Sequence, residues 1–394
     1  MSSVFPSRAT SQRIEWVDAA KAIGIFLVFY GHFVQRFVDL GVSSALYQMR
    51  WVYAFHIPLF FLLVGLVYKD RGLSLDVFIK RQVLTRLVPV WVFNIVNMLL
   101  SVASEYLRGE SGWVVQHGWA SLAGHFAKKT WAMFYQGQAN WNIVTWFLIC
   151  LFTVEFWQFF LQPLLRKTWN LVFSIGLFGV ATVLVSTYAE DIHNVLGPKQ
   201  HWWHVSSGLG AMFFYQLGIL MRRLGLLIKE RSTLHRCALG AICLAVTLAT
   251  FNLNDPLNNS PLPVVLMVGA KYGNVWWFFL TALAGTGFVI YASQLLAVSS
   301  LLKYVGQVTL ALMCLDGIFH DFVNPPVARL IVSLMPEQNV LLFTGIYLVG
   351  TALSIVISIP VIWLLNRYLP FVLGRGMGRA AVTSRAQKDG GGAS

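Results

Sequence analysis

Long apolar runs recur along the whole 394-residue chain. A helix needs about 20 mostly apolar residues to cross the ~30 Å hydrocarbon core of a bilayer, and run after run is close to that length. Only 11% of the residues are charged, whereas soluble domains have roughly 25%. Because the runs are continuous and do not alternate with polar residues, they favour spanning helices over barrel strands. The sequence therefore predicts an all-α polytopic membrane protein.

We predict about ten transmembrane helices. The weakest of these predictions are the second and the sixth runs, which are short. The predicted spans are 20–38, 52–68, 87–104, 142–164, 169–187, 206–222, 236–252, 274–297, 304–324 and 341–364.

The distribution of positive charge predicts the orientation, because short cytoplasmic loops retain lysine and arginine. With a cytoplasmic N-terminus, most of the 29 lysines and arginines fall in inner segments, and shifting one span would weaken this bias. We therefore expect both termini in the cytoplasm. The net charge of +13 is then a topology signal and requires no nucleic-acid partner.

The loops are too short to contain a separate soluble domain, so residues 1–368 are predicted to form one integral-membrane domain. Residues 369–394 are rich in glycine and arginine, which predicts a disordered basic tail in the cytoplasm. The four cysteines fall inside predicted helices, where core packing is the favoured interpretation.

An ionisable side chain inside a span is costly and is therefore a candidate functional group. Five residues meet this condition: His32, His56, Glu155, Asp316 and His320. Asp316 and His320 are four positions apart and share a helix face. A carboxylate beside an imidazole raises its basicity, as in hydrolytic triads. For these two residues and for Glu155, a catalytic and a structural role both remain open.

Lys21 and His32 lie on nearly one face of the first span, because eleven residues turn a helix about 20° past three full turns. They are about 16 Å apart along the axis. Lys21 is then at the cytoplasmic rim and His32 near mid-membrane. This arrangement suits an anion held at the inner surface and a proton handled deeper in. The alternative is a snorkelling lysine and a structural histidine.

Two further stretches add candidates. His56 is followed by Pro58, where a bend can aim the imidazole inward. Lys80, Arg81 and Arg86 cluster at the cytoplasmic mouth of the third span. Such a cluster either binds phosphates, which arginine matches bidentately, or only retains the loop in the cytoplasm.

The stretch "HWWH" at 201–204 has two histidines three positions apart, but no carboxylate or cysteine follows at ligand spacing. We therefore expect no metal site. Trp202 and Trp203 are candidates for stacking on a sugar face or for anchoring at the membrane interface.

Several of these stretches resemble the integral-membrane acyltransferase type 3 family, especially its fucose 4-O-acetylase-like branch. "RIEWVDAAKAIGIFLVFYGHF" resembles the family's first span, in which a basic residue, ten others and a histidine occur in that order. "FHIPLFFLLVGLVY" resembles the second span, and "FIKRQVLTRLVPVW" the basic start of the third. "TWFLICLF", "AMFFYQLGILMRR" and "YVGQVTLALMCLDGIFH" resemble later spans. Two positions depart from the pattern: Val64 replaces a frequent serine, and Asp316 a histidine or asparagine.

The resemblance implies an enzyme of the bacterial inner membrane that moves an acetyl group from acetyl-CoA, as co-substrate, to a carbohydrate hydroxyl. By this resemblance His32 is the general base and Trp146 a substrate contact. The basic residues Lys21, Lys80, Arg81 and Arg86 are then expected to hold the CoA phosphates.

Other interpretations stay open at this stage. The acceptor is an envelope or exported polysaccharide or its lipid-linked precursor, and the acyl group is acetyl or another short chain. A transporter of a glycan or lipid precursor is the main alternative, although no internal repeat supports it. A third is a non-catalytic relative that binds acyl-CoA or lipid. The sequence leaves a homo-oligomer open.

Overall fold

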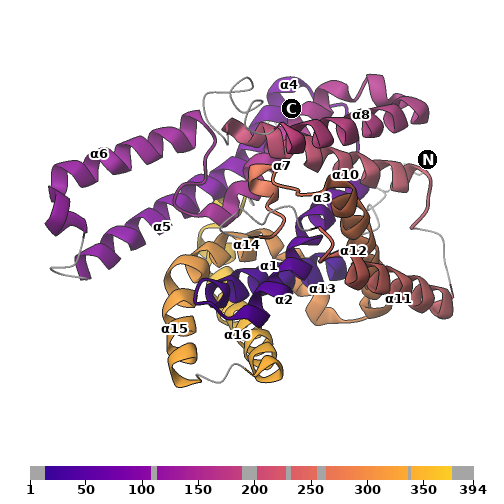
Figure 1. Cartoon of the computed structure of the whole chain (residues 1–394). Helices are drawn as coiled ribbons and strands as arrows, with labels where there is room; N and C mark the ends of the chain where they lie inside the picture. The colour runs from indigo at the N-terminus through magenta and orange to yellow at the C-terminus, as the bar shows by residue number, and fades with distance from the viewer. Residues whose placement is uncertain are drawn as a thin grey trace, which may run out of the picture.

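The computed structural model describes residues 14–107, 113–188, 202–227, 232–254, 263–335 and 339–374. This part of the chain is helical, and its one β contact is an isolated antiparallel bridge between Leu266 and Lys271. The prediction of an all-α membrane protein is confirmed (Figure 1).

The helices follow one another along the chain. The α-helices are α1 (Glu15–Val38), α2 (Ser43–Tyr53), α3 (His56–Val67), α4 (Leu75–Gln82), α5 (Val88–Leu107), α6 (Trp113–Tyr135), α7 (Trp146–Leu161), α8 (Thr168–Thr187), α10 (Val205–Arg223), α11 (Thr233–Thr250), α12 (Val275–Leu296), α13 (Ser300–Gln307), α14 (Thr309–Ile318), α15 (Asn324–Leu334) and α16 (Val340–Tyr368). Two π-helices, η1 (Val83–Leu87) and η7 (Phe319–Val323), interrupt the helical path. Short 3₁₀ turns are η3 (Ile143–Thr145), η4 (Leu164–Arg166), η5 (Trp202–His204), η6 (Met267–Gly269) and η8 (Pro370–Leu373).

Eight helical segments of the described chain are long and apolar enough to cross a membrane, and a ninth is obtained if one bent pair counts as a single span. The bent pair, Ser300–Gln307 with Thr309–Leu334, turns by 69° and corresponds to the predicted span 304–324. The predicted span 206–222 forms α10, which is 19 residues long but is not among these segments. Each of the ten predicted spans therefore corresponds to a helix, and eight or nine of them qualify as crossing.

The second predicted span, 52–68, is part of a longer and broken segment, Ser43–Val67. The break lies at Ala54 and Phe55, so His56 is the first residue of α3. Pro58 stands in the first turn of α3, where its missing N–H costs no helical hydrogen bond. The bend expected at Pro58 is thus a helix break at Ala54 and Phe55, which ends three residues before the proline and puts His56 at a helix start.

Helix α1 lies at the centre of the fold, where it contacts α2, α3, α12, α13, α14, α15 and α16. Glycines permit close packing nearby. A Cβ atom on Gly65 would lie 1.8 Å from the carbonyl oxygen of Tyr215, and one on Gly218 would lie 2.1 Å from that of Leu62. These contacts bring α3 and α10 together backbone to backbone and make α10 part of the core.

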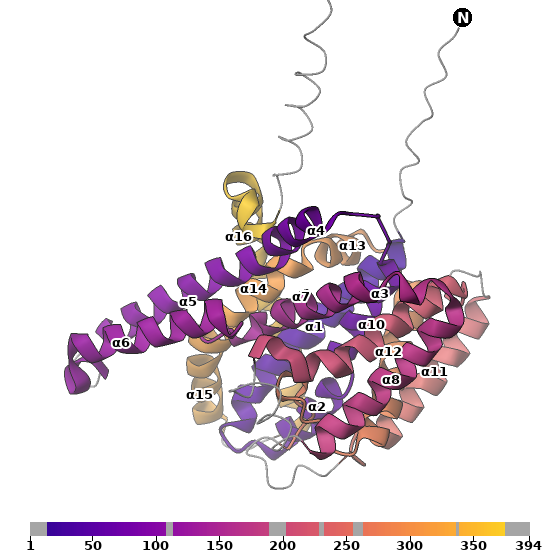
Figure 2. The same ribbon diagram turned by 90° about the horizontal axis from the view of Figure 1, so that it is seen from above.

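The segment between the third and fourth predicted spans contains α6, a helix that the sequence did not predict. In Figures 1 and 2, α5 and α6 lie side by side and extend away from the other helices. The predicted C-terminal tail begins with η8, in which Val372 and Leu373 are buried. Residues 375–394 of that tail lie outside the described residues.

Candidate active site

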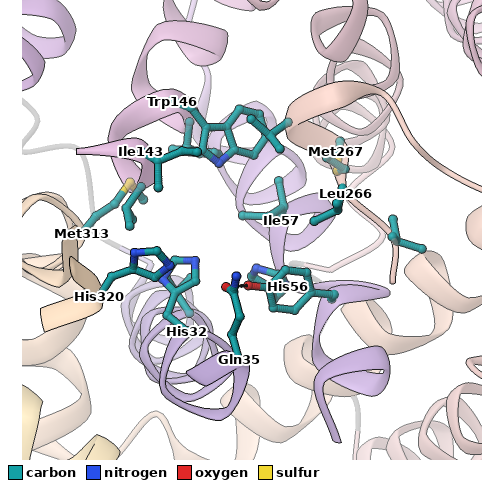
Figure 3. A pocket seen from close by; sticks show the side chains of 16 residues that line it. His32, Gln35, His56, Ile57, Ile143, Trp146, Leu266, Met267, Met313 and His320 are labelled. Atoms are coloured by element: carbon teal, nitrogen blue, oxygen red, sulfur yellow. Dashed lines mark hydrogen bonds between the residues drawn. The ribbon is translucent and has the colours of Figure 1, made fainter. Parts of the chain in front are cut away.

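One cavity of about 240 Å³ lies beside α1, among α3, α7, α14 and the segment 265–268. We call it the histidine cavity (Figure 3). Its polar lining consists of His32, Gln35, Tyr53, His56 and His320. Its walls are mostly apolar and include Ile57, Ile143, Trp146, Leu266, Met267 and Met313. The cavity brings together three of the five ionisable residues predicted as catalytic candidates.

His32 is paired with Asp316, whose carboxylate is fully buried. The Nδ1 atom of His32 lies 2.6 Å from Asp316 Oδ2. Such a carboxylate holds the proton on Nδ1 and leaves Nε2 as the basic atom. Because the His32 side chain is 17% exposed and lines the cavity, this arrangement can accept a proton from a bound hydroxyl.

The expectation that Asp316 stands beside His320 is wrong, because its carboxylate binds His32 instead. The helix widens from α14 into the π-helix η7 at Phe319. A π turn advances less per residue than an α turn, so His320 is rotated off the face of Asp316. His320 Nδ1 lies 2.7 Å from Asp321 Oδ1, and its ring centroid lies 5.1 Å from that of His32.

Arg36 and Asp321 hold His320 in place, and neither was predicted as a site residue. Arg36 donates to the backbone carbonyl of His320 from Nε at 3.1 Å and from Nη2 at 2.8 Å. Asn97 Nδ2 donates to Asp321 Oδ2 at 3.2 Å. Arg36 is four residues after His32 on α1, so its place beside the site could have been inferred from helical spacing. The contacts of Asp321 depend on the tertiary fold and could not have been inferred in this way.

His56 and Gln35 complete the polar lining. His56 Nδ1 donates to the carbonyl oxygen of Val52 at 2.8 Å. In a neutral imidazole only one nitrogen carries a proton, so Nε2 of His56 is an acceptor. Tyr53 donates to Gln35 Oε1 at 3.3 Å. Gln35 was not predicted as a site residue, although it is three positions after His32 on the same helix.

A second cavity, of about 560 Å³, lies at the other end of α3 and α7. We call it the arginine cavity. Its basic lining residues are Lys69, Arg71, Arg81, Arg86 and Arg166. This end carries the loops predicted to be cytoplasmic.

The predicted phosphate-binding residues are distributed unevenly around the arginine cavity. Arg81 and Arg86 line it, but Lys80 and Lys21 are not among its lining residues. Lys21 lies on α1 with its Nζ 3.9 Å from Asp18 Oδ1. The structure therefore brings together two of the four predicted residues in this cavity.

Glu155 lies at the arginine cavity and not at the histidine cavity. Its two carboxylate oxygens accept from Arg86 Nε and Nη2, both at 3.0 Å. Arg86 belongs to the π-helix η1, a rare turn type that is frequent at functional sites. In the loop after α3, the backbone N–H of Gly72 donates to Asp70 at 3.0 Å and lowers the pKa of that carboxyl. The cavity therefore contains negative as well as positive groups.

Helices α3 and α7 connect the two cavities. On α3, His56 lines the histidine cavity and Val64 the arginine cavity, about 12 Å apart along the axis. On α7 the corresponding residues are Trp146 and Glu155. The rings of Phe61 and Phe147 lie between these ends, with centroids 4.8 Å apart. The two cavities therefore lie at opposite ends of the same pair of helices.

The three tryptophans predicted to bind substrate lie in different surroundings. Trp146 lines the histidine cavity. Trp202 and Trp203 are not among its lining residues. Trp203 packs over Gly137 and donates from Nε1 to the carbonyl oxygen of Tyr135 at 3.1 Å. Within the described residues, no cluster of three histidine, cysteine or acidic side chains forms a metal site.

The helices and the two cavities define a polytopic membrane protein with an Asp–His pair at one site and clustered arginines at the other. A family model described as an acyltransferase domain matches residues 14–363, and the chain belongs to this integral-membrane acyltransferase 3 family. It is thus a membrane acyltransferase by family, and the transporter alternative has no support. Neither a curated protein nor a solved structure matches the chain.

Proposed function

We propose that the chain transfers an acetyl or other short acyl group from acyl-CoA to a hydroxyl of an envelope or exported polysaccharide, or of its lipid-linked precursor, in the bacterial inner membrane. The observation that carries this proposal is the His32–Asp316 pair, which faces a cavity joined by α3 and α7 to a cluster of arginines.

The arginine cavity is the proposed site for the CoA moiety. Guanidinium groups bind phosphates bidentately, and Arg71, Arg81 and Arg166 line the cavity. Arg86 already forms an ion pair with Glu155, so part of its proposed role in CoA binding is to hold that side of the cavity in place. Lys21 and Lys80 remain proposed contacts at the rim. The thioester end of acyl-CoA would then extend along α3 and α7 toward His32.

His32 is the proposed general base. Its Nε2 takes the proton of the acceptor hydroxyl as the hydroxyl oxygen attacks the thioester carbonyl carbon. The tetrahedral intermediate then expels the CoA sulfur, and the thiolate takes the proton from His32 as the C–S bond breaks. Asp316 keeps Nδ1 protonated and stabilises the imidazolium that forms between the two steps. The acceptor gains the acyl group and CoA leaves as a thiol.

A carbohydrate acceptor is supported by the resemblance to the fucose 4-O-acetylase-like branch and by Trp146 in the cavity wall. Aromatic faces pack well against the apolar face of a sugar ring. His56 and His320 also line the cavity and are proposed to bind or orient the acceptor.

The test is transfer of radiolabelled acyl groups in isolated membranes. Membranes with the native protein and membranes without it receive labelled acetyl-CoA or labelled succinyl-CoA, and the glycan fraction is extracted. We expect label in glycan only with the protein present. An equal amount of label with and without the protein, for both donors, would refute the proposed transfer.

A further inference from the structure

Two glutamines of this protein have the same kind of tyrosine partner but different surroundings. Gln48 on α2 accepts from the hydroxyl of Tyr30. Its amide nitrogen donates to Thr344 Oγ1 at 2.9 Å. The hydrogen-bonding groups of Gln48 are thus used within the protein, as expected for a structural glutamine.

Gln35 differs because its amide nitrogen is left for a ligand. Tyr53 donates to Gln35 Oε1 at 3.3 Å, which fixes the carbonyl oxygen and turns the NH₂ group toward the histidine cavity (Figure 3). Among the described residues no acceptor binds that NH₂ group. Gln35 is also one turn from His32 on the same face of α1. Its two N–H donors therefore point to where a substrate of His32 would lie.

The remaining polar groups complement such a donor. The ring nitrogen Nε2 of His56 is an acceptor, since Nδ1 donates to the backbone of Val52. A sugar presents adjacent hydroxyls that both donate and accept. Gln35 and His56 can thus bind the hydroxyls next to the one that His32 deprotonates.

The charge of the cavity restricts the acceptor further. No aspartate, glutamate, lysine or arginine is among the described residues that line it. Asp316 is fully buried behind His32, and Arg36 is engaged with His320 and Asp39. A carboxylate or phosphate bound among these apolar walls would lose its hydration without gaining a counter-ion, which is strongly unfavourable. The arginine cavity, by contrast, suits anions.

We propose that the histidine cavity takes a neutral sugar unit of the acceptor and that Gln35, oriented by Tyr53, donates a hydrogen bond that positions it. Charged units of the same glycan stay outside the cavity. This proposal rests on the proposed function and adds the charge class of the acceptor and a specificity-determining residue.

The first test locates the transferred label. Membranes whose envelope glycan contains both neutral sugars and uronic acids receive labelled acetyl-CoA, the glycan is depolymerised enzymatically, and the fragments are separated by charge down to single sugar units. We expect the label on neutral units. Label on the charged units would overturn the proposal while leaving the acyltransferase intact, whereas absence of protein-dependent label would count against the proposed function itself.

The second test compares Gln35→Leu with the matched control Gln48→Leu. Loss of one hydrogen bond to a neutral acceptor should lower transfer at limiting acceptor about tenfold in Gln35→Leu. Transfer by Gln48→Leu should stay within about twofold of native, since that glutamine faces no substrate. Acetyl-CoA binding should be unchanged in both variants. Equal transfer by the two variants would refute the role of Gln35.

Gln35→Glu guards against a folding defect, because it keeps the shape of the side chain but replaces the N–H donors with acceptors. It should transfer as poorly as Gln35→Leu. Because a carboxylate in this cavity lowers stability, folding of the variant is checked by native helix content at the assay temperature. Native transfer by Gln35→Glu would contradict donation by Gln35.

Discussion

His32 and Asp316 are 284 residues apart in the sequence, yet their side chains meet at 2.6 Å. Both are costly ionisable groups inside predicted spans, which is a local property that the apolar runs of the sequence reveal. Their pairing could not be predicted from the sequence, because the contact depends on how α14 packs against α1. The π turn of η7 further removes His320 from the position that a regular helix would give it.

Arg86 is a basic residue of the arginine cavity and also has a structural role, because it forms an ion pair with Glu155. Their side chains are only 22% and 11% exposed, so removal of one leaves a nearly buried charge without a partner. Arg86→Ala should therefore destabilise the protein by about 2–4 kcal/mol, measured as thermal unfolding in detergent. The double variant Arg86→Ala, Glu155→Ala should regain part of that loss. A double variant less stable than Arg86→Ala would contradict the pairing.

Arg81 is the better probe of the proposed donor site, since no ion pair of the described residues involves its guanidinium. Arg81→Ala should weaken acetyl-CoA binding about tenfold through loss of a charge-assisted contact, with native thermal unfolding. Unchanged affinity for acetyl-CoA would mean that Arg81 only helps to retain its loop in the cytoplasm.

At the scale of elements, continuous apolar runs were sufficient to predict where helices form. They were insufficient where backbone geometry changes within a run. The break before His56 and the π turns at Arg86 and His320 depend on packing against other helices. Each of these three interruptions carries a side chain of one of the cavities.

The close approach of α3 and α10 is testable through one methyl group. Gly65→Ala places a Cβ atom 1.8 Å from a backbone oxygen of α10, so the helices must separate. We expect a loss of about 3 kcal/mol or more, measured by thermal unfolding in detergent. Gly176→Ala on α8 is the matched control, because its Cβ would meet nothing within 4 Å. Equal stability of both variants would refute the close packing of α3 on α10.

At the scale of the whole molecule, the two cavities lie at opposite ends of α3 and α7. The spacing of Lys21 and His32 and the basic cluster of Lys80, Arg81 and Arg86 predicted anion binding and proton transfer at different depths of the membrane. The two cavities are separated in the same sense, but the basic residues that line the arginine cavity are mostly arginines around η1, and Lys21 and Lys80 are not among them. The cluster forms from α4, η1 and the segments that follow α3 and α7, whose meeting could not be predicted from the sequence.

A bulky residue between the cavities should separate CoA binding from transfer. Val64 lines the arginine cavity on α3, on the way to His56. Val64→Trp should lower acetyl transfer more than tenfold by blocking the acyl arm. Binding of adenosine 3′,5′-bisphosphate, which lacks that arm, should be unchanged. Val180→Trp, at a residue of α8 that is 57% exposed and lines neither cavity, is the control and should transfer normally. Equal transfer by both variants would contradict a path along α3.

The most direct test of the account is transfer of labelled acetyl groups from acetyl-CoA to glycan by the native protein, His32→Gln, Asp316→Asn and the control His235→Gln. His235 lies on α11 and lines neither cavity. We predict native transfer by His235→Gln, none above background by His32→Gln, and a loss of roughly 10²–10⁴-fold for Asp316→Asn, which misorients the imidazole proton. Native rates for a folded His32→Gln would contradict the account.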